Sequence, residues 1–481
     1  EISECLHINT NDMAKYIIFD PSHISRIKAG KTRPSDPIDF TKKVSSYIVY
    51  KYNDDISKKE LSLLLKCNVE DLKEKTNFFN LVFKWLSKST EENKDDKIEK
   101  FLNNLDNFDL NDYIKAIKFD ELKIPFVPFY HIKNKDYYGL EEMKKGELDF
   151  FKAVVLSKNK EDVFMCSDMP MEDMAKDVDF GKKWMFAIAL CLKKGLHLNV
   201  IHNLDRPFNE MMLGLESWIP IYMTGQVSPF YFKEIKNTVY NHLNYVGGPV
   251  FLTGECIEGY HSKGKYRLSN SSDELKYFKE KASLLLRKAT PLMNIYREND
   301  KEKFYQFINE ESKKEGERNR VLSSLPLFTI TDKLLIKILK RENISEQEIE
   351  KILKYKNTEL EMAKEILKSN KINDTIYEVK SKNFDEQNIY LSLENTFCSK
   401  KIKYHYKEYL EHLNSTLDFK KKNRNYNVIL SNVKTFNNII ITSFNDDYVI
   451  ISKNANPVIH FIIRHPKLVT AINNFIPLVK E

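Results

Sequence analysis

The chain has 481 residues, a formal net charge of +7, and 42% hydrophobic and 12% aromatic residues, which excludes a largely disordered protein. It is long enough for two or three domains with sizeable cores, and the modest charge neither requires nor excludes a nucleic-acid partner. Its six cysteines form no C-x-x-C pair, and no signal peptide or apolar run of about 18 residues occurs. We therefore expect a cytoplasmic protein with reduced thiols and no membrane span.

Residues 9–34 predict two short helices joined by a tight turn. Asn9 is suited to cap the first helix, and Ala14 is small where a second helix would cross it closely. Pro21 disfavours a helical conformation for the residue before it and is a good first residue for the next helix. Gly30 suits the C-terminal end of that second helix.

The second helix and its tail form a basic strip. Between Ser22 and Arg33 the chain has four basic residues and no carboxylate: Arg26, Lys28, Lys31 and Arg33. Ile24 and Ile27 point inward in this helix, which leaves Ser22, His23, Arg26 and Lys28 outside. Such a strip suits contact with phosphates, and an exposed arginine can also read guanine.

The run Ile24-Ser25-Arg26-Ile27-x-x-Gly30-Lys31-x-x-Pro34, together with Ala14, resembles the lambda-repressor-like helix-turn-helix of the XRE family of regulators. The resemblance implies an all-α domain in which Thr10 touches phosphate and Ser22, His23 and Arg26 face base edges. It also implies that Lys31 and Arg33 clamp the DNA backbone.

This sequence departs from the family pattern at two places. Ile18 stands where the family usually has glycine in the turn, so we expect a distorted turn or a longer first helix. The sequence also begins at Glu1, too close to the motif for a full preceding helix, and we expect several further residues before it.

The rest of the chain predicts a multidomain protein in which the all-α domain precedes a large α/β (α+β) region with mixed sheets. Apolar stripes at helical spacing run through residues 37–88, and a polar run follows them. The expected parts are a helix-turn-helix domain at 1–88, a linker at 89–98, an α/β sensor domain at 99–330, a helical insertion at 331–370 and a second α/β part at 371–481.

Within this region, helices at 150–156 and 184–192 alternate with strands at 162–166 and 196–201, which favours parallel strands. We expect further strands at 219–223, 249–253, 376–379, 428–430, 439–441 and 448–451, and helices at 272–289 and 466–475. No internal repeat is convincing, although both halves pair strands with a following helix.

Two polar clusters are candidates for a ligand pocket. His202, Asp205 and Arg206 follow a predicted strand, where α/β sheets usually bind ligands. Glu255 and His261 follow another, but their spacing matches no zinc signature. The alternative interpretation of both clusters is a hydrogen-bonded polar rim.

The sequence His261-Ser-Lys263 resembles the His-x-Lys of phospholipase D-like hydrolases. The partner aspartate of that motif is missing, since Leu268 occupies its position. The resemblance therefore supports only a related, non-catalytic sheet architecture. We find no phosphate-binding glycine loop or nucleophile elbow, and we predict no catalytic residue, metal or cofactor.

The leading hypothesis is a bacterial transcription regulator that binds double-stranded DNA as a homodimer and senses a small-molecule or peptide effector through its C-terminal region. An abundance of Lys, Asn and Ile with few Gly is typical of an AT-rich bacterial coding sequence. The alternative is a hydrolase or phosphodiesterase-like enzyme that the helical module targets to DNA. A third hypothesis is a protein-interaction module without DNA affinity.

Overall fold

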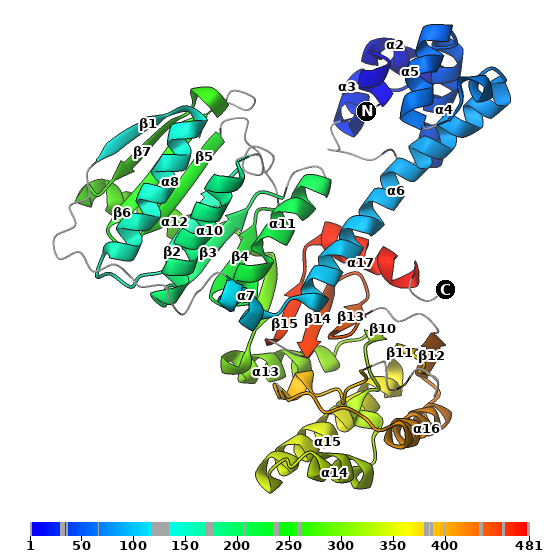
Figure 1. Ribbon diagram of the computed structural model, residues 1–481, viewed down its shortest axis with the longest axis vertical. Helices are drawn as coiled ribbons and strands as arrows, with labels where there is room; N and C mark the ends of the chain where they lie inside the picture. The colour runs from blue at the N-terminus through cyan, green and yellow to red at the C-terminus, as the bar shows by residue number, and fades with distance from the viewer. Residues whose placement is uncertain are drawn as a thin grey trace. The chain divides into compact units, whose positions relative to one another are not determined.

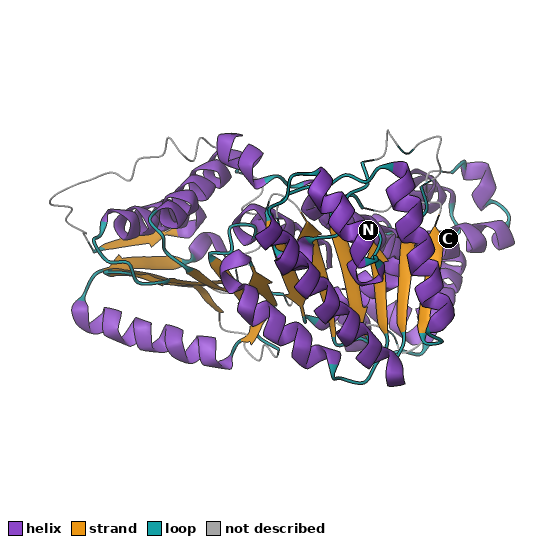
Figure 2. Ribbon diagram, turned by 90° about the horizontal axis from the view of Figure 1, so that it is seen from below, coloured by secondary structure: helices purple, strands orange, loops and turns teal. Residues whose placement is uncertain are grey.

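The computed structural model describes residues 2–28, 34, 37–65, 67–116, 134–168, 177–204, 208–233, 240–256, 261–379, 384, 388–398, 400–431, 436–454 and 457–478. The chain divides into two compact units, residues 1–100 with 205–214 and residues 101–204 with 215–481. The first unit is helical, and the second contains two mixed sheets with their helices (Figures 1 and 2). The predicted fold class is confirmed.

The N-terminal helical domain is built around the motif. Its helices are α1 (Ile2–Cys5), α2 (Thr10–Ile17), α3 (Pro21–Lys28), α4 (Pro37–Lys51), α5 (Asp55–Leu65), the 3-10 helix η1 (Val69–Leu72) and the first part of α6 (Lys75–Asn107). Ala14, Ile24, Ile48, Leu61 and Phe78 are completely buried in one core. The apolar stripes that predict these helices are therefore the residues that pack them together.

Helix α6 contains the expected linker. Residues 89–98 lie inside this 33-residue helix, and the two compact units meet within it at Lys100 and Phe101. The segment contains no glycine or proline, and its lysines and glutamates have good helix propensity. High polarity alone therefore did not indicate a loop here.

The first sheet has eight strands in the order β1-β7-β6-β5-β2-β3-β4-β8. They are β1 (Lys135–Tyr138), β2 (Val163–Ser167), β3 (Leu198–His202), β4 (Val227–Tyr231), β5 (Tyr240–Gly247), β6 (Val250–Cys256), β7 (Lys265–Ser269) and β8 (Thr290–Pro291). Its helices are α8 (Gly139–Leu156), α10 (Val178–Lys193), α11 (Phe208–Tyr222) and α12 (Ser272–Lys288). Strands β2 and β3 are parallel, as predicted, and β4 is parallel to β3, while β5, β6 and β7 form an antiparallel meander.

The second sheet has seven strands in the order β12-β11-β10-β13-β14-β15-β9. They are β9 (Met293–Tyr296), β10 (Arg318–Leu322), β11 (Ile372–Tyr377), β12 (Tyr426–Ser431), β13 (Ile439–Phe444), β14 (Tyr448–Asn454) and β15 (Val458–Ile463). Its helices are α13 (Lys301–Ser312), α14 (Asp332–Arg341), α15 (Glu346–Ser369), α16 (Tyr406–Lys422) and α17 (Pro466–Leu478). We call the part of the chain from β9 to α17 the second sheet domain.

The two sheets have the same topology. In each, three parallel strands are joined by helical crossovers, and an antiparallel meander of three strands pairs with the first of them. An edge strand formed earlier in the chain, β1 or β9, then pairs with the last strand of the meander. Helices α8 and α13 follow the edge strands, and α12 and α17 follow the meanders. The chain therefore contains a structural repeat, which the sequence did not reveal.

This repeat changes the interpretation of two segments. Residues 331–370 form α14 and α15, which connect the parallel strands β10 and β11 as a crossover of the second sheet domain. Residues 219–222 of the expected strand at 219–223 belong to helix α11, in which Pro220 is accommodated. A short apolar run fits a buried helix and a buried strand equally well, so periodicity could not separate them.

The C-terminal end of α6 is fixed to the second sheet through Asp106, which is 2% exposed. Its carboxylate accepts hydrogen bonds from the backbone N–H groups of Asn437, Asn438 and Ile439 at 2.6–3.2 Å. Lys453 Nζ donates to the Asp106 carbonyl oxygen at 2.6 Å. We call these residues the Asp106 clamp. Among the described residues, no helix is long and apolar enough to cross a membrane.

Candidate nucleic-acid interface

Helices α2 and α3 are positioned by their own end residues. The Asn9 side chain accepts hydrogen bonds from the N–H groups of Asn11 and Asp12, which confirms the predicted N-cap. Asp20 caps α3 in the same way, since its carboxylate accepts from the His23 N–H at 3.0 Å and from the Ser22 hydroxyl. Both caps are local, so the few residues of sequence around each one suffice to recognise it.

The turn between the helices passes through Ile18. This residue ends α2 in the left-handed conformation, with φ 56° and ψ 57°, and is 89% exposed. Glycine adopts this conformation without steric cost, whereas a β-branched side chain is strained there. The helix therefore ends where the family has glycine and is not extended, so the alternative of a longer first helix is wrong.

Helix α3 presents a polar face. Ile24 is completely buried and Ile27 partly so, while Ser22, Arg26 and Lys28 are exposed and His23 is half-buried against the Phe19 ring. The Arg26 side chain makes a long 3.4 Å hydrogen bond from Nε to the Ser22 carbonyl oxygen, which leaves the tip of the guanidinium available. Ser22, Arg26 and Lys28 are therefore exposed as predicted, whereas His23, which was also predicted outside, is half-buried.

Thr10 and Lys28, far apart in sequence, come together at one end of the motif. Lys28 Nζ donates a hydrogen bond to Thr10 Oγ1 at 3.3 Å. Thr10 is the first residue of α2, where the helix dipole favours an anion, although Asn9 already accepts the Asn11 and Asp12 N–H groups. A hydroxyl, an ammonium and a helix N-terminus on one spot are the groups that bind a phosphate oxygen.

The carboxylate of Asp20 lies at the N-terminal end of the α3 face. Its hydrogen bonds from the Ser22 hydroxyl and the His23 N–H hold its pKa below the ordinary value. The group stays ionised at neutral pH and repels phosphate at the N-terminal end of α3. The basic end of the face is therefore the C-terminal end, at Arg26 and Lys28.

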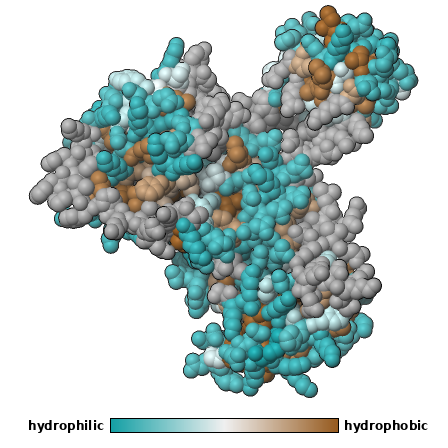
Figure 3. All heavy atoms as spheres, viewed as in Figure 1, coloured by the Kyte–Doolittle hydropathy of each residue, from teal (hydrophilic) through white to brown (hydrophobic). Residues whose placement is uncertain are grey.

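Lys31 and Arg33 lie outside the described residues. The exposed surface of the helical domain also carries apolar side chains, the most exposed of which are Ile18, Ile56 and Leu63. Figure 3 shows apolar atoms on the face of this domain turned to the viewer.

The residues of the other candidate pocket are dispersed. His202 ends β3, where its Nε2 lies 3.1 Å from the Tyr222 hydroxyl and its ring meets Trp218 edge-on. Glu255 lies on β6, which is separated from β3 by β5 and β2, a distance of about 14 Å at ordinary strand spacing. His261 belongs to the 3-10 helix His261–Lys263, while Asp205 and Arg206 lie outside the described residues.

These positions indicate that His202 belongs to a cluster in which it is hydrogen-bonded to Tyr222 and packs against Trp218. They do not favour a site that His202 shares with Glu255. In the part of the chain that the structure describes, no three His, Cys, Asp or Glu side chains gather as metal ligands. All six cysteines are free.

No protein-family model matches the chain, and no curated protein is significantly similar to it. Among solved structures, it is similar to TrmBL2, described as an archaeal chromatin protein with a novel mode of DNA binding, with 11% identity, coverage of 45% of this chain and 69% of that one, and a TM-score of 0.25. It is also similar to polyphosphate kinase from Porphyromonas gingivalis, with 10% identity over 71% of this chain and 49% of that chain, and a TM-score of 0.22.

A third similar structure is NucT from Helicobacter pylori, with 12% identity over 33% of this chain and 98% of that chain, and a TM-score of 0.22. Similarities at TM-scores of 0.25 or below do not assign a function to the chain.

Proposed function

We propose that the protein is a regulator that binds double-stranded DNA through the exposed face of α3. The observation that carries the proposal is the convergence of Thr10 and Lys28 at 3.3 Å, with Arg26 exposed on the same helix as Lys28. A recognition helix needs base-reading side chains on its face and phosphate contacts at its edges, and this arrangement offers both.

The resemblance to XRE-family regulators gives the finer form of the proposal. Ser22, His23 and Arg26 read base edges in the major groove, and Thr10 and Lys28, with Lys31 and Arg33, contact phosphates. A single module of this kind has a small interface, so the protein binds two half-sites as a homodimer. We propose no catalytic step, because the strand order keeps His202 and Glu255 apart.

Binding of selected duplex DNA by alanine variants tests the proposal. DNA sites are enriched from a random pool with the full-length protein, and affinity is measured by gel shift at several salt concentrations. Arg26→Ala is expected to cost about 1–3 kcal/mol and to relax the sequence preference. Lys28→Ala is expected to weaken binding to all sequences and to lower the salt dependence by about one phosphate contact.

Lys59→Ala is the matched control, because Lys59 is exposed on α5 of the same domain and outside the proposed surface. Its affinity and selectivity should equal those of the parent. Unchanged affinity and selectivity of Arg26→Ala, or no retention of DNA by the parent protein at low salt, would contradict the proposal.

A further inference from the structure

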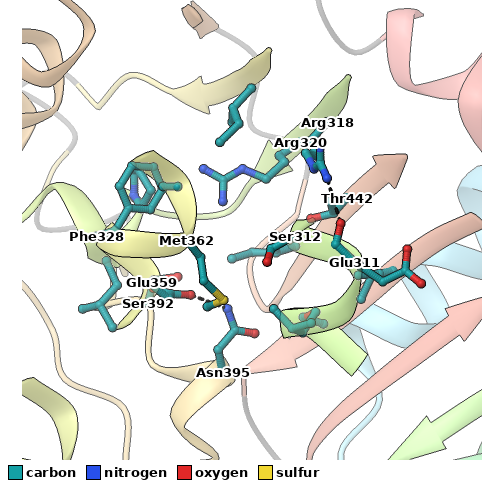
Figure 4. Close-up of a pocket in the computed structure, with 18 of the residues that line it drawn as sticks. Glu311, Ser312, Arg318, Arg320, Phe328, Glu359, Met362, Ser392, Asn395 and Thr442 are labelled. Atoms are coloured by element: carbon teal, nitrogen blue, oxygen red, sulfur yellow. Dashed lines mark hydrogen bonds between the residues drawn. The ribbon is translucent and has the colours of Figure 1, made fainter. Parts of the chain in front are cut away.

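The second sheet domain contains a cavity of about 160 Å³. It lies on the face of strands β10, β13 and β14 that α13 and α15 cover (Figure 4). Its walls are largely apolar, with Leu322, Phe328, Met362, Ile366 and Ile450. Its polar lining includes Arg320, Glu359, Ser392, Glu394 and Asn395.

The charge of Arg320 in this cavity is already neutralised by a carboxylate. Arg320 forms a bidentate ion pair with Asp374, with Nε–Oδ1 and Nη2–Oδ2 distances of 2.6 Å, and Asp374 is completely buried. A second arginine of the lining, Arg318, donates to the carbonyl oxygens of Glu311, Lys314 and Gly316. Neither guanidinium is free to serve as the main partner of a ligand.

Of the three glutamates in the lining, Glu311 pairs with Lys314 at 2.8 Å, whereas Glu359 and Glu394 have only neutral hydrogen-bond partners. Glu359 Oε1 accepts hydrogen bonds from Asn395 Nδ2 at 2.8 Å and from the Tyr355 hydroxyl at 3.3 Å. Glu394 accepts from the Ser392 hydroxyl at 2.8 and 3.0 Å. Within the described part of the chain, neither carboxyl forms a salt bridge with a lysine or arginine.

Burial therefore makes it costly to ionise either group. It raises the pKa of Glu394 to about 7 and that of Glu359 above its ordinary value. The titratable groups that face the two carboxyls are Arg320 of β10, Tyr305 of α13, Tyr355 of α15 and Tyr404 before α16, while His460 of β15 faces the Glu394 backbone. Only one of these, Arg320, is a permanent cation, and Asp374 holds it.

The first sheet shows that its topology does not require such a cavity. The corresponding region there, between β2, β5 and helices α8 and α10, is filled by aromatic rings. Tyr245 packs against Phe150 and Phe151, and Phe151 packs edge-on against Trp184 at 5.9 Å. In the second sheet domain the corresponding region is instead a cavity with charged residues in its lining.

We propose that the cavity of the second sheet domain binds a small organic cation, a primary ammonium carried on an apolar body. The ammonium lies between Glu359 and Glu394 and supplies the charge that their neutral partners do not. The apolar body lies against Phe328 and Met362 of the walls. Because an ammonium favours the ionised carboxylates, binding releases a proton near neutral pH.

The cavity also shares two strands with the Asp106 clamp. Ile440 and Ser452 are paired across β13 and β14 and line the cavity, and the next pair is Ile439 and Lys453, both of which hold Asp106. Since side chains alternate across a sheet, the cavity and the clamp lie on opposite faces of one strand pair. A cation bound in the cavity therefore changes how the Asp106 clamp holds the C-terminal end of α6. This regulatory role rests on the proposed function.

Isothermal titration calorimetry of the full-length protein tests the binding. The probes are phenethylamine, 2-phenylethanol and phenylacetate, which have the same ring and chain length but carry a positive, no and a negative charge. We expect only phenethylamine to bind, with an affinity that rises from pH 6 to pH 8 and an observed enthalpy that depends on the buffer because a proton is released. Equal binding of the alcohol or the carboxylate, or no binding of phenethylamine, overturns the proposal.

Glu359→Gln and Glu394→Gln should each lower phenethylamine affinity about tenfold or more. Glu361→Gln is the control, since Glu361 is exposed on the same helix, and its affinity should not change. The melting temperature of each variant reports whether the domain is folded. If the folded variants bind as tightly as the parent, the assignment to these two residues is overturned.

A DNA titration with and without saturating phenethylamine separates this proposal from the proposed function. We expect DNA affinity to change about fivefold or more. An unchanged DNA affinity overturns the regulatory role of the cavity. If the protein binds phenethylamine but no DNA, the proposed function fails and the assignment of the cavity stands.

Discussion

At Ile18 the residue departs from the family pattern, but the backbone keeps the conformation that the pattern requires. The turn retains the left-handed conformation that glycine would adopt freely, and the isoleucine side chain is left almost entirely in solvent. This turn therefore differs from one with glycine by the strain of its conformation and not by the loss of a contact.

Ile18→Gly is therefore expected to stabilise the helical domain by about 1 kcal/mol. Hydrogen–deuterium exchange of the α2 and α3 amides in the full-length protein measures the change as slower exchange. Ile56→Gly is the matched control, because Ile56 is also exposed but lies within α5, where glycine should cost about 0.5 kcal/mol. Faster exchange in Ile18→Gly would contradict the account of the turn.

Glu147 on α8 is a buried carboxyl in the first sheet region. It accepts a hydrogen bond from the Tyr245 hydroxyl at 3.4 Å, and burial raises its pKa from 4.5 to about 8. The folded protein therefore keeps the proton between pH 4.5 and 8, whereas the unfolded chain loses it. Stability falls by about 1.4 kcal/mol for each pH unit in this window, because the unfolded state binds fewer protons.

Glu147→Gln removes this pH dependence. We expect the variant to be more stable than the parent by on the order of 3 kcal/mol at pH 7.5, and the difference to vanish near pH 4.5. Urea unfolding followed by tryptophan fluorescence is suitable, since Trp184 and Trp218 lie in contact at 5.5 Å in this region. Glu280→Gln, at an exposed position of α12, should show no such trend. A variant that is less stable at pH 7.5 would contradict the prediction.

At the scale of elements, the ends of helices could be predicted better than the nature of the segments between them. Asn9 and Pro21 mark helix starts because capping and proline geometry depend on neighbouring residues alone. The segment 89–98 was expected to be a linker because it is polar, yet polar residues with good helix propensity continue α6. Whether such a segment is helical depends on the packed helical turns on either side of it. The residues of the segment alone do not reveal these turns.

The Asp106 clamp is the element-scale contact that holds the C-terminal end of α6. Asp106→Ala leaves three backbone N–H groups without their acceptor, which should cost about 3 kcal/mol. Hydrogen–deuterium exchange is expected to become faster at Asn438 and Ile439 and across the last turns of α6. Asp112→Ala, at an exposed position of α7 (Leu110–Ala116), should leave these amides unchanged. Equal protection in Asp106→Ala and the parent would show that other contacts fix this helix.

At the scale of the whole molecule, the fold class was predictable but the repeat was not. Alternating strands and helices indicated parallel β2 and β3, and the strands of the second sheet at 428–430, 439–441 and 448–451 were placed correctly. The edge strands β1 and β9 are only four residues long, and they are paired by partners more than 100 residues away. No local pattern specifies such pairing.

The two candidate sites also differ in whether a local pattern or the long-range topology specifies them. The α3 face comes from one continuous segment, so its exposed residues could be named from the sequence. The cavity joins Arg320 of β10, Glu359 of α15 and Glu394 of a later segment, and only the topology brings them together. His202 and Glu255 looked equivalent because both follow strands, but the order of strands in the sheet separates them.

In each sheet the first strand pairs with the last strand of the meander, and this pairing determines the order in which the chain can fold. Tyr137 of β1 pairs with Tyr266 of β7, and Ile295 of β9 pairs with Phe461 of β15, so neither sheet is complete until its last strand has been synthesised. Non-local pairing of this kind makes folding slow, because the entropy of closing a long loop is lost before the contacts form. During synthesis the first sheet can close while the second still lacks its final strand. The two copies of the fold therefore form in sequence along the growing chain, and β9 waits longest for its partner.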